Sequence, residues 1–172
     1  MAFGFFSRLP VIVEPVDAQL SSDVGILPIR QFDDQIGYTQ RLAACLHDPR
    51  DPDQIDHPFP LMVRQRFYGI LAGYEDCNDH DGLRSDPVFK IVSGRAPEED
   101  DLASQPTLSR FENLIDIASL WRLHDFFIDD FLRSFERPPA SITLDLDAVD
   151  DPCHVQQQLA LFHGFYDQHQ YL

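Results

Sequence analysis

The fold class is decided by residues 141–149, which read Ser141-Ile142-Thr143-Leu144-Asp145-Leu146-Asp147-Ala148-Val149. Apolar and polar side chains alternate along this stretch with a period of two, which is typical of a β-strand. Side chains two positions apart lie on the same face of a strand, so Asp145 and Asp147 are expected to be neighbours. Two adjacent carboxylates repel each other, which raises one pKa or recruits a cation. The stretch therefore predicts a strand that carries a candidate acidic site.

The chemistry of these two aspartates has two interpretations. Hard divalent cations such as Mg²⁺ are held by one or two carboxylates together with the phosphate oxygens of a substrate. Aspartates within an apolar strand are thus a candidate metal site for phosphoryl transfer. The alternative is an acidic strand end that faces water, and the spacing alone leaves both interpretations open.

Upstream of this strand, apolar residues recur at helical spacing. We expect helices over 31–47 and 59–74, and shorter ones over 79–84 and 87–93. The last of these has Asp86 as its expected N-cap and Pro87 at its first position.

The strongest helical pattern covers residues 107–135 and is rich in phenylalanine. It is expected to form one helix or two helices that break near 113–116. Arg137-Pro138-Pro139 ends the pattern, because proline cannot continue a helix.

Further strands are expected at both ends of the helical block. Residues 11–13 and 25–29 are apolar runs on either side of a predicted turn at 21–23, which indicates a strand pair. Residues 158–163 indicate another strand. The predicted class is α+β, with a mostly helical region over 1–137 and strands over 138–172. One or two strands cannot form an independent sheet, so residues 138–172 either pack on the helices or begin a larger domain.

The charge is strongly acidic. The 172 residues contain 13 Lys and Arg against 29 Asp and Glu, for a net charge of −16. This favours a soluble surface and argues against nucleic-acid binding through overall electrostatics. No apolar run reaches the roughly 18–20 residues of a membrane span. We expect no signal peptide and no membrane partner, and a cytoplasmic location with reduced cysteines.

Common catalytic and metal-binding motifs are missing from the sequence. It has no GxGxxG, P-loop or GxSxG pattern, and its seven histidines form no HExxH pair. We expect the histidines to be surface or packing residues. Several arginines, Arg64, Arg66, Arg110, Arg122 and Arg133, could contact phosphates, but ion pairing with the many acids is the favoured interpretation.

Four segments together resemble the DDE transposases of bacterial insertion sequences. They occur in the family's order along nearly the whole chain, and four in register are fairly specific although each alone is weak. The segments are Ser21–Gly25 followed by an apolar run, Gly73–Asp79 with Leu83–Pro87, Ala103–Asn113, and Leu144–Asp147 with Asp150–His154.

The resemblance implies a helical N-terminal region followed by a catalytic core of ribonuclease H-like fold. In that family three acidic residues bind two divalent metals, normally Mg²⁺, and water and then a DNA 3′-hydroxyl attack phosphodiesters. Asp147 would be the first, metal-binding acid, with Asp145 as the second choice. The implied partner is DNA at transposon ends, and a homodimer is a further expectation.

The sequence departs from the family pattern at two positions and in its acidic residues. Val149 stands where a small hydroxyl residue is usual, and Val155 stands where glycine usually follows the histidine. The second Asp and the Glu of the triad are expected beyond residue 172. Two-metal catalysis needs all its ligands, so we expect this chain to be a catalytically incomplete, truncated transposase.

Two other functions compete with this one. Residues 142–149 also match the first motif of haloacid-dehalogenase-like phosphatases, with Asp145 as nucleophile and Asp147 as acid/base. However, only 23 residues follow Val149, too few for that fold. The remaining alternative is a non-enzymatic helical interaction module that binds a partner helix through 107–135.

Overall fold

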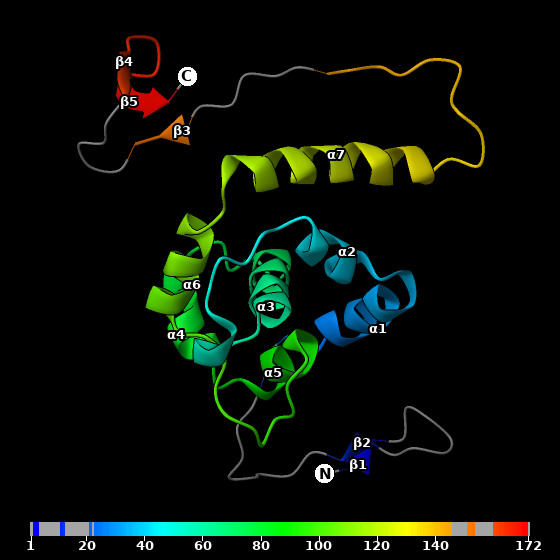
Figure 1. Ribbon diagram of the computed structural model, residues 1–172, viewed down its shortest axis with the longest axis vertical. Coiled ribbons are helices and arrows are strands. Elements are labelled where there is room, and N and C mark those ends of the chain that lie inside the picture. The colour runs from blue at the N-terminus through cyan, green and yellow to red at the C-terminus, as the bar shows by residue number, and fades with distance from the viewer. Residues whose placement is uncertain are drawn as a thin grey trace. The chain divides into compact units, whose positions relative to one another are not determined.

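The computed structural model describes residues 2–3, 11–12, 21, 23–145, 151–153 and 160–171. It is mostly helical with small antiparallel sheets, a mixed α and β composition (Figure 1). The chain divides into two compact units, Met1–Ser134 and Phe135–Leu172. Within the described residues, no helix is long and apolar enough to cross a membrane.

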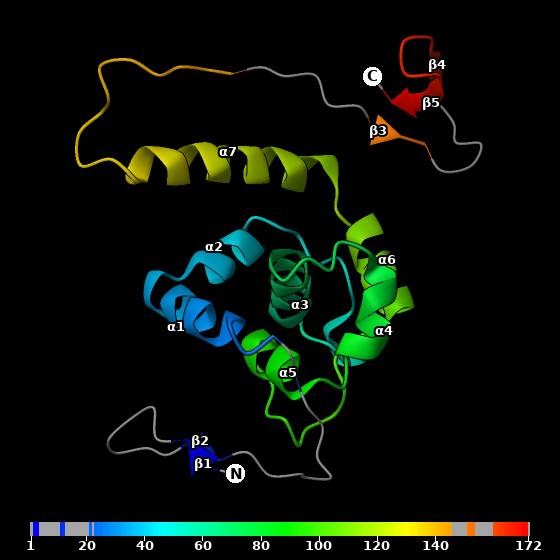
Figure 2. The same ribbon diagram turned by 180° about the vertical axis from the view of Figure 1, so that it is seen from behind.

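The first unit contains seven α-helices among its described residues. Figures 1 and 2 show α3 in the middle of this unit with α2, α5 and α6 around it. The α-helices are α1 (Ile26–Ile36), α2 (Tyr38–Ala44), α3 (Phe59–Leu71), α4 (His80–Leu83), α5 (Pro87–Ser93), α6 (Gln105–Asn113) and α7 (Ile117–Arg133). Two 3-10 turns, η1 (Pro52–Gln54) and η2 (Cys77–Asp79), and the antiparallel pair β1 (Ala2–Phe3) and β2 (Val11–Ile12) complete it.

Helix α3 joins the two hydrophobic clusters of the core. Leu61 and Tyr68 pack with residues of α1 and α5, whereas Met62 and Val63 pack with α2 and α6. Full burial of one such side chain contributes about 1.5–3 kcal/mol. The central helix therefore holds α1, α2, α5 and α6 together through two of its sides.

Several predicted helices are confirmed. The helices expected over 59–74 and 87–93 are α3 and α5. The Asp86 carboxylate caps α5 by accepting hydrogen bonds from the backbone N–H groups of Val88 (2.8 Å) and Phe89 (3.0 Å). The long pattern over 107–135 is two helices, because Asp116 caps the start of α7 by accepting from the Ser119 N–H at 2.7 Å.

Two predictions in the N-terminal part are wrong. Residues 26–29, expected as a strand, begin α1, where Ile26 is buried in the core. Pro28 is tolerated because it lies in the first turn, where its missing N–H costs nothing. The single helix expected over 31–47 is interrupted at Gly37, whose φ of 65° ends α1. Only glycine adopts this left-handed conformation without strain, so the chain turns there and starts α2.

The second unit is a small antiparallel sheet with strand order β3-β5-β4. Its strands are β3 (Asp151–Pro152), β4 (Leu161–His163) and β5 (Gln168–Tyr171), and Leu161 pairs with Gln170. The strand predicted over 158–163 is confirmed for 161–163, and β5 was not predicted. Residues 141–145 form no strand, contrary to the prediction for 141–149, and 146–150 lie outside the described residues. A β-strand needs a hydrogen-bonded neighbour, and none of the described strands pairs with 141–145.

Candidate functional site

The predicted acidic site falls partly outside the described residues. Asp145 lies in an irregular segment of the second unit and is exposed. Asp147 belongs to the stretch 146–150, so its position relative to Asp145 is not described. In the described part of the chain, no group of three His, Cys, Asp or Glu residues could hold a metal ion.

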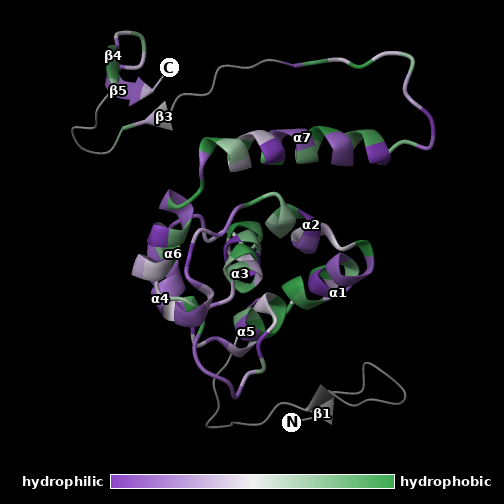
Figure 3. Cartoon of the chain, viewed as in Figure 1, coloured by the Kyte–Doolittle hydropathy of each residue, from purple (hydrophilic) through white to green (hydrophobic). Residues whose placement is uncertain are grey.

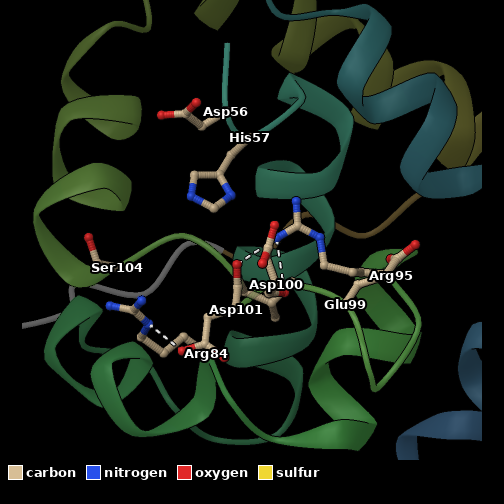
Figure 4. Close-up of a pocket in the computed structure, with 9 residues that line it drawn as sticks. Asp56, His57, Arg84, Arg95, Glu99, Asp100, Asp101 and Ser104 are labelled. Atoms are coloured by element: carbon tan, nitrogen blue, oxygen red, sulfur yellow. Dashed lines mark hydrogen bonds and ion pairs between the residues drawn. The ribbon is translucent and has the colours of Figure 1, made fainter.

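A polar pocket of the first unit lies beside the loop that follows α5 (Figure 4). Its volume is about 700 Å³. Two arginines, one histidine and four acids dominate its lining, which consists of Asp56, His57, Arg84, Arg95, Glu99, Asp100, Asp101, Leu102 and Ser104.

The cations of this pocket hold the loop in place. The Arg84 Nε lies 3.3 Å from an Asp101 carboxylate oxygen, and Arg95 donates to the Asp100 carbonyl at 3.1 Å. Lys90, the only lysine, is buried and donates to the Glu99 carbonyl at 2.9 Å. The acidic run Glu98–Asp101 is thus fastened by three cations. These contacts make the pocket a structural junction, and sequence reasoning missed them because two of the three cations bind backbone carbonyls, which no residue pattern reveals.

His57 and Arg84 each have a buried nitrogen without a hydrogen-bond partner among the described contacts. The Arg84 Nε still lies in the ion pair with Asp101, whereas the His57 Nδ1 has no described ion pair. Burial lowers the pKa of His57, and the nearby Arg95 lowers it further. The imidazole is therefore neutral at pH 7, but the described residues place no nucleophile against it, so the pocket does not form a catalytic pair.

A second polar cluster lies inside the first unit, around the buried Asp33. Its carboxylate accepts hydrogen bonds from the Thr39 N–H (2.8 Å), the Thr39 hydroxyl and the Tyr68 hydroxyl (3.0 Å). Burial alone would raise the pKa of Asp33, but these hydrogen bonds and the Arg30 guanidinium lower it. Burial and the Asp33 carboxylate raise the pKa of Tyr68. The cluster joins α1, α2 and α3, and it is structural.

The third polar cluster surrounds His80, which is fully buried. The Arg66 Nη1 lies 3.3 Å from its Nε2, and the Gln65 Nε2 lies 3.4 Å from its Nδ1. Burial lowers the pKa of His80 to about 4, and the positive charge of Arg66 acts in the same direction. His80 is therefore a neutral packing residue, as the sequence predicted for the histidines.

The arginines named as possible phosphate ligands divide between ion pairs and local hydrogen bonds. Arg66 pairs with Glu112 at 2.6 Å, as the favoured interpretation predicts. Arg64 donates to the Thr39 hydroxyl, and Arg122 donates to the Cys45 carbonyl. The contact described for Arg110 is with the Thr107 hydroxyl, at 3.2 Å.

Comparison with known protein families decides the family. The sequence model described as Transposase DDE domain group 1 matches residues 5–172, nearly the whole chain. The chain belongs to this family of transposase DDE domains. The predicted resemblance is confirmed, and neither the phosphatase nor the helical interaction module finds support.

DDE transposases generally use divalent metal ions, and the family points to DNA as the partner. Comparisons with curated proteins and with solved structures found no match. The transposase assignment of this chain therefore stands on the family model.

Proposed function

We propose that this chain acts in DNA transposition as part of a DDE-type transposase that recognises transposon ends. The observation that carries the proposal is the family match over residues 5–172. The order of the elements supports it, since a helical unit precedes a unit that contains strands. We assign residues 138–172 to the beginning of a catalytic domain of ribonuclease H-like fold and residues 1–137 to the helical region before it.

The first catalytic acid in this proposal is Asp147, with Asp145 as the second choice. Mg²⁺ is a hard cation that prefers carboxylate oxygens, so the donor type of both residues fits it. Asp145 is exposed, so its carboxylate is accessible to solvent and to a phosphate. When bound, the metal supplies Lewis-acid stabilisation of the phosphodiester oxygens. The Asp147 carboxylate would hold one ligand position and orient the metal toward the DNA backbone.

Residues 1–172 by themselves are proposed to be catalytically incomplete. A two-metal site must clamp the attacking and the leaving oxygen, which needs ligands beyond one pair of aspartates. Among the described residues, no further acids gather into a cluster that could complete the site. We therefore expect this chain to bind a divalent metal weakly and to cleave no DNA.

The acidic charge bears on the proposed DNA partner. At −16, the chain as a whole repels the phosphate backbone. DNA contact then requires locally placed cations or a bound metal ion, because the net charge of the chain does not attract DNA. A homodimer, which would bring two chains to two transposon ends, is part of the same proposal.

Paramagnetic Mn²⁺ tests the assignment of the acid. Mn²⁺ is titrated into the ¹⁵N-labelled chain while the backbone amide signals are followed. We expect selective broadening at residues 145–149, strongly reduced by Asp147→Asn, less by Asp145→Asn and unchanged by Asp167→Asn, an exposed aspartate of the same unit. Broadening confined to another acidic segment, such as 98–101, would overturn the assignment.

A strand-cleavage assay tests the proposed incompleteness. Residues 1–172 are incubated with duplex DNA and Mg²⁺, and we expect no cleaved DNA strands. Cleavage that Asp147→Ala abolishes would contradict incompleteness and leave the assignment of Asp147 standing.

A further inference from the structure

Helix α7 has two faces of different character. One face packs on the rest of the first unit. On this face Ser119 and Phe126 are buried, and the Phe126 ring meets the Tyr38 ring edge to face. Asp130 on the same side forms an ion pair with Arg41 at 2.7 Å. This face therefore fixes the orientation of α7 on the unit.

The opposite face of α7 is apolar and exposed (Figure 3 shows the hydrophobic residues along the helix). Ile117 is 74% exposed and Trp121 is 64% exposed. The described residues that form this face, named here the α7 face, are Ile117, Leu120, Trp121, Phe127, Ile128 and Leu132, each at least 46% exposed. Such a contiguous apolar surface marks an interaction site.

The spacing along the α7 face is that of a helix-packing seam. Ile117, Trp121, His124 and Ile128 follow one another at intervals of four, three and four residues. This is the spacing at which one helix interdigitates with another in a coiled-coil-like pair. Leu120 and Phe127 widen the seam on one side, and Leu132 widens it on the other. The buried Ser119 and Phe126 fall on the opposite side of the helix, so they do not occupy the seam, whose apolar residues stay exposed beside the described part of the unit.

The chemistry of the α7 face excludes two kinds of occupant. No lysine or arginine lies among its six residues, and the neighbouring Asp125 is 77% exposed in its side chain. DNA and anionic membrane surfaces both attract a binding face that is bordered by basic residues, whereas Asp125 makes the border of this face acidic. The occupant is therefore another protein surface that is apolar at its centre.

The area of the face fits a second copy of this chain. At their given exposures, the six side chains present on the order of 700 Å², close to the roughly 800 Å² per partner of a standard protein interface. A two-fold pair of identical faces buries this area twice, which a stable dimer needs. The acidic border stays at the edge of such a pair, where water and salt screen it.

We propose that the α7 face is a self-association surface through which two copies of this chain pack helix against helix. Trp121 lies within the seam and stacks edge to face with His124 at 5.7 Å between ring centroids. A large aromatic side chain in the middle of an interface is the typical hot spot of binding. This inference rests on the homodimer that is part of the proposed function, and it identifies the surface of that homodimer. Its test involves no DNA chemistry.

Sedimentation analysis of the full chain over a range of concentrations provides the first test. The expected species has twice the 19.8 kDa mass of the chain and dissociates on dilution. Because Trp121 is the only tryptophan, its emission is expected to shift to longer wavelength as the dimer dissociates. A monomer at every concentration would overturn the proposal, as would a blue-shifted emission that dilution leaves unchanged, since residues of the same copy would then cover Trp121.

Charge substitutions locate the surface. Ile128→Glu places a carboxylate in the seam and is expected to weaken dimerisation at least about 30-fold, as loss of a hot spot does. Trp121→Ala is expected to act similarly. The matched control is Ile70→Glu, at a 54% exposed position of α3, which is expected to leave dimerisation unchanged. Circular dichroism checks that all variants keep their helices. Equal dimerisation of Ile128→Glu and the parent chain, or equal weakening by Ile70→Glu, would show that the copies associate elsewhere.

Discussion

The side-chain amide of Gln65 on α3 forms two hydrogen bonds with the backbone of Ala103, 38 residues further along the chain. Its Nε2 donates to the Ala103 carbonyl at 2.8 Å, and its Oε1 accepts from the Ala103 N–H at 3.1 Å. Both residues are fully buried. The amide thus satisfies both backbone hydrogen-bonding groups of Ala103, as a neighbouring strand would in a sheet. It fixes the segment between α5 and α6 against the central helix.

The substitution Gln65→Leu tests this relationship. It leaves the buried N–H and carbonyl of Ala103 unsatisfied, which costs about 1–3 kcal/mol for such a group. We expect the free energy of unfolding, measured by urea denaturation, to fall by about 2–4 kcal/mol. Gln40→Leu, at an exposed position of α2, is the control and should change it by less than about 0.5 kcal/mol. A loss no larger than that of the control would show that Gln65 contributes little.

Gly69 is required by the close approach of α3 to His80. A Cβ at position 69 would lie 2.7 Å from the His80 ring, and His80 is fully buried and cannot move aside freely. Gly69→Ala is therefore expected to lower the unfolding free energy by about 1–3 kcal/mol, as overpacking does. Gly82→Ala provides the opposite case, because a Cβ there meets nothing within 4 Å. Alanine should stabilise that helical position by about 0.5 kcal/mol, and a destabilisation similar to that of Gly69→Ala would contradict this explanation.

The stability of the fold is expected to fall as the pH is lowered from about 6.5 to about 4. In the unfolded chain His80 takes up a proton near its usual pKa of about 6.5, whereas in the folded chain its pKa is about 4. The unfolded state thus binds more protons in this range, and lowering the pH favours it by on the order of 2 kcal/mol. His57, whose pKa is also lowered, acts in the same direction.

Denaturation at pH 7 and pH 4.5 measures this effect. His80→Gln removes the titrating group and should show a smaller loss of stability between the two pH values than the parent chain. His124→Gln, at an exposed histidine of α7, should keep the parent loss. An equal loss in both variants would exclude His80 as the cause.

The Asp33 cluster should respond to the loss of one charge. Asp33→Asn removes a buried carboxylate that accepts from Thr39 and Tyr68, and hydrogen bonds to charged groups contribute about 1.5–3 kcal/mol each. We expect the free energy of unfolding to fall by about 2–4 kcal/mol at pH 7. The exposed neighbour Asp34, which pairs with Arg30 at the surface, provides the control. Asp34→Asn should cost less than about 1 kcal/mol, and equal losses would assign the effect to the surface pair with Arg30.

Local signals in the sequence were sufficient for the best-predicted elements. Asp86 is a typical N-cap residue and Pro87 is typical of the first helical position, so the pair predicts the start of α5 correctly. The apolar stripe of 59–71 likewise identifies α3. In contrast, Ile26–Ile29 has the apolar run of a strand, and its helical state depends on burial of Ile26 in the core, which a local pattern does not contain.

The candidate sites were less predictable, because their partners are distant in sequence. Asp33 meets Tyr68 across 35 positions and His80 meets Gln65 across 15. Neither pair has a spacing motif. The Asp145 and Asp147 motif is local and was found at once, but its role depends on ligands that the described residues do not bring to it.

The DNA on both sides of the gene tests the proposed role in transposition most directly. We predict terminal inverted repeats around the gene, and coding sequence downstream, in the same or a shifted frame, for an aspartate on a strand and a glutamate on a helix. A gene without flanking repeats and without any such continuation would contradict a role in transposition.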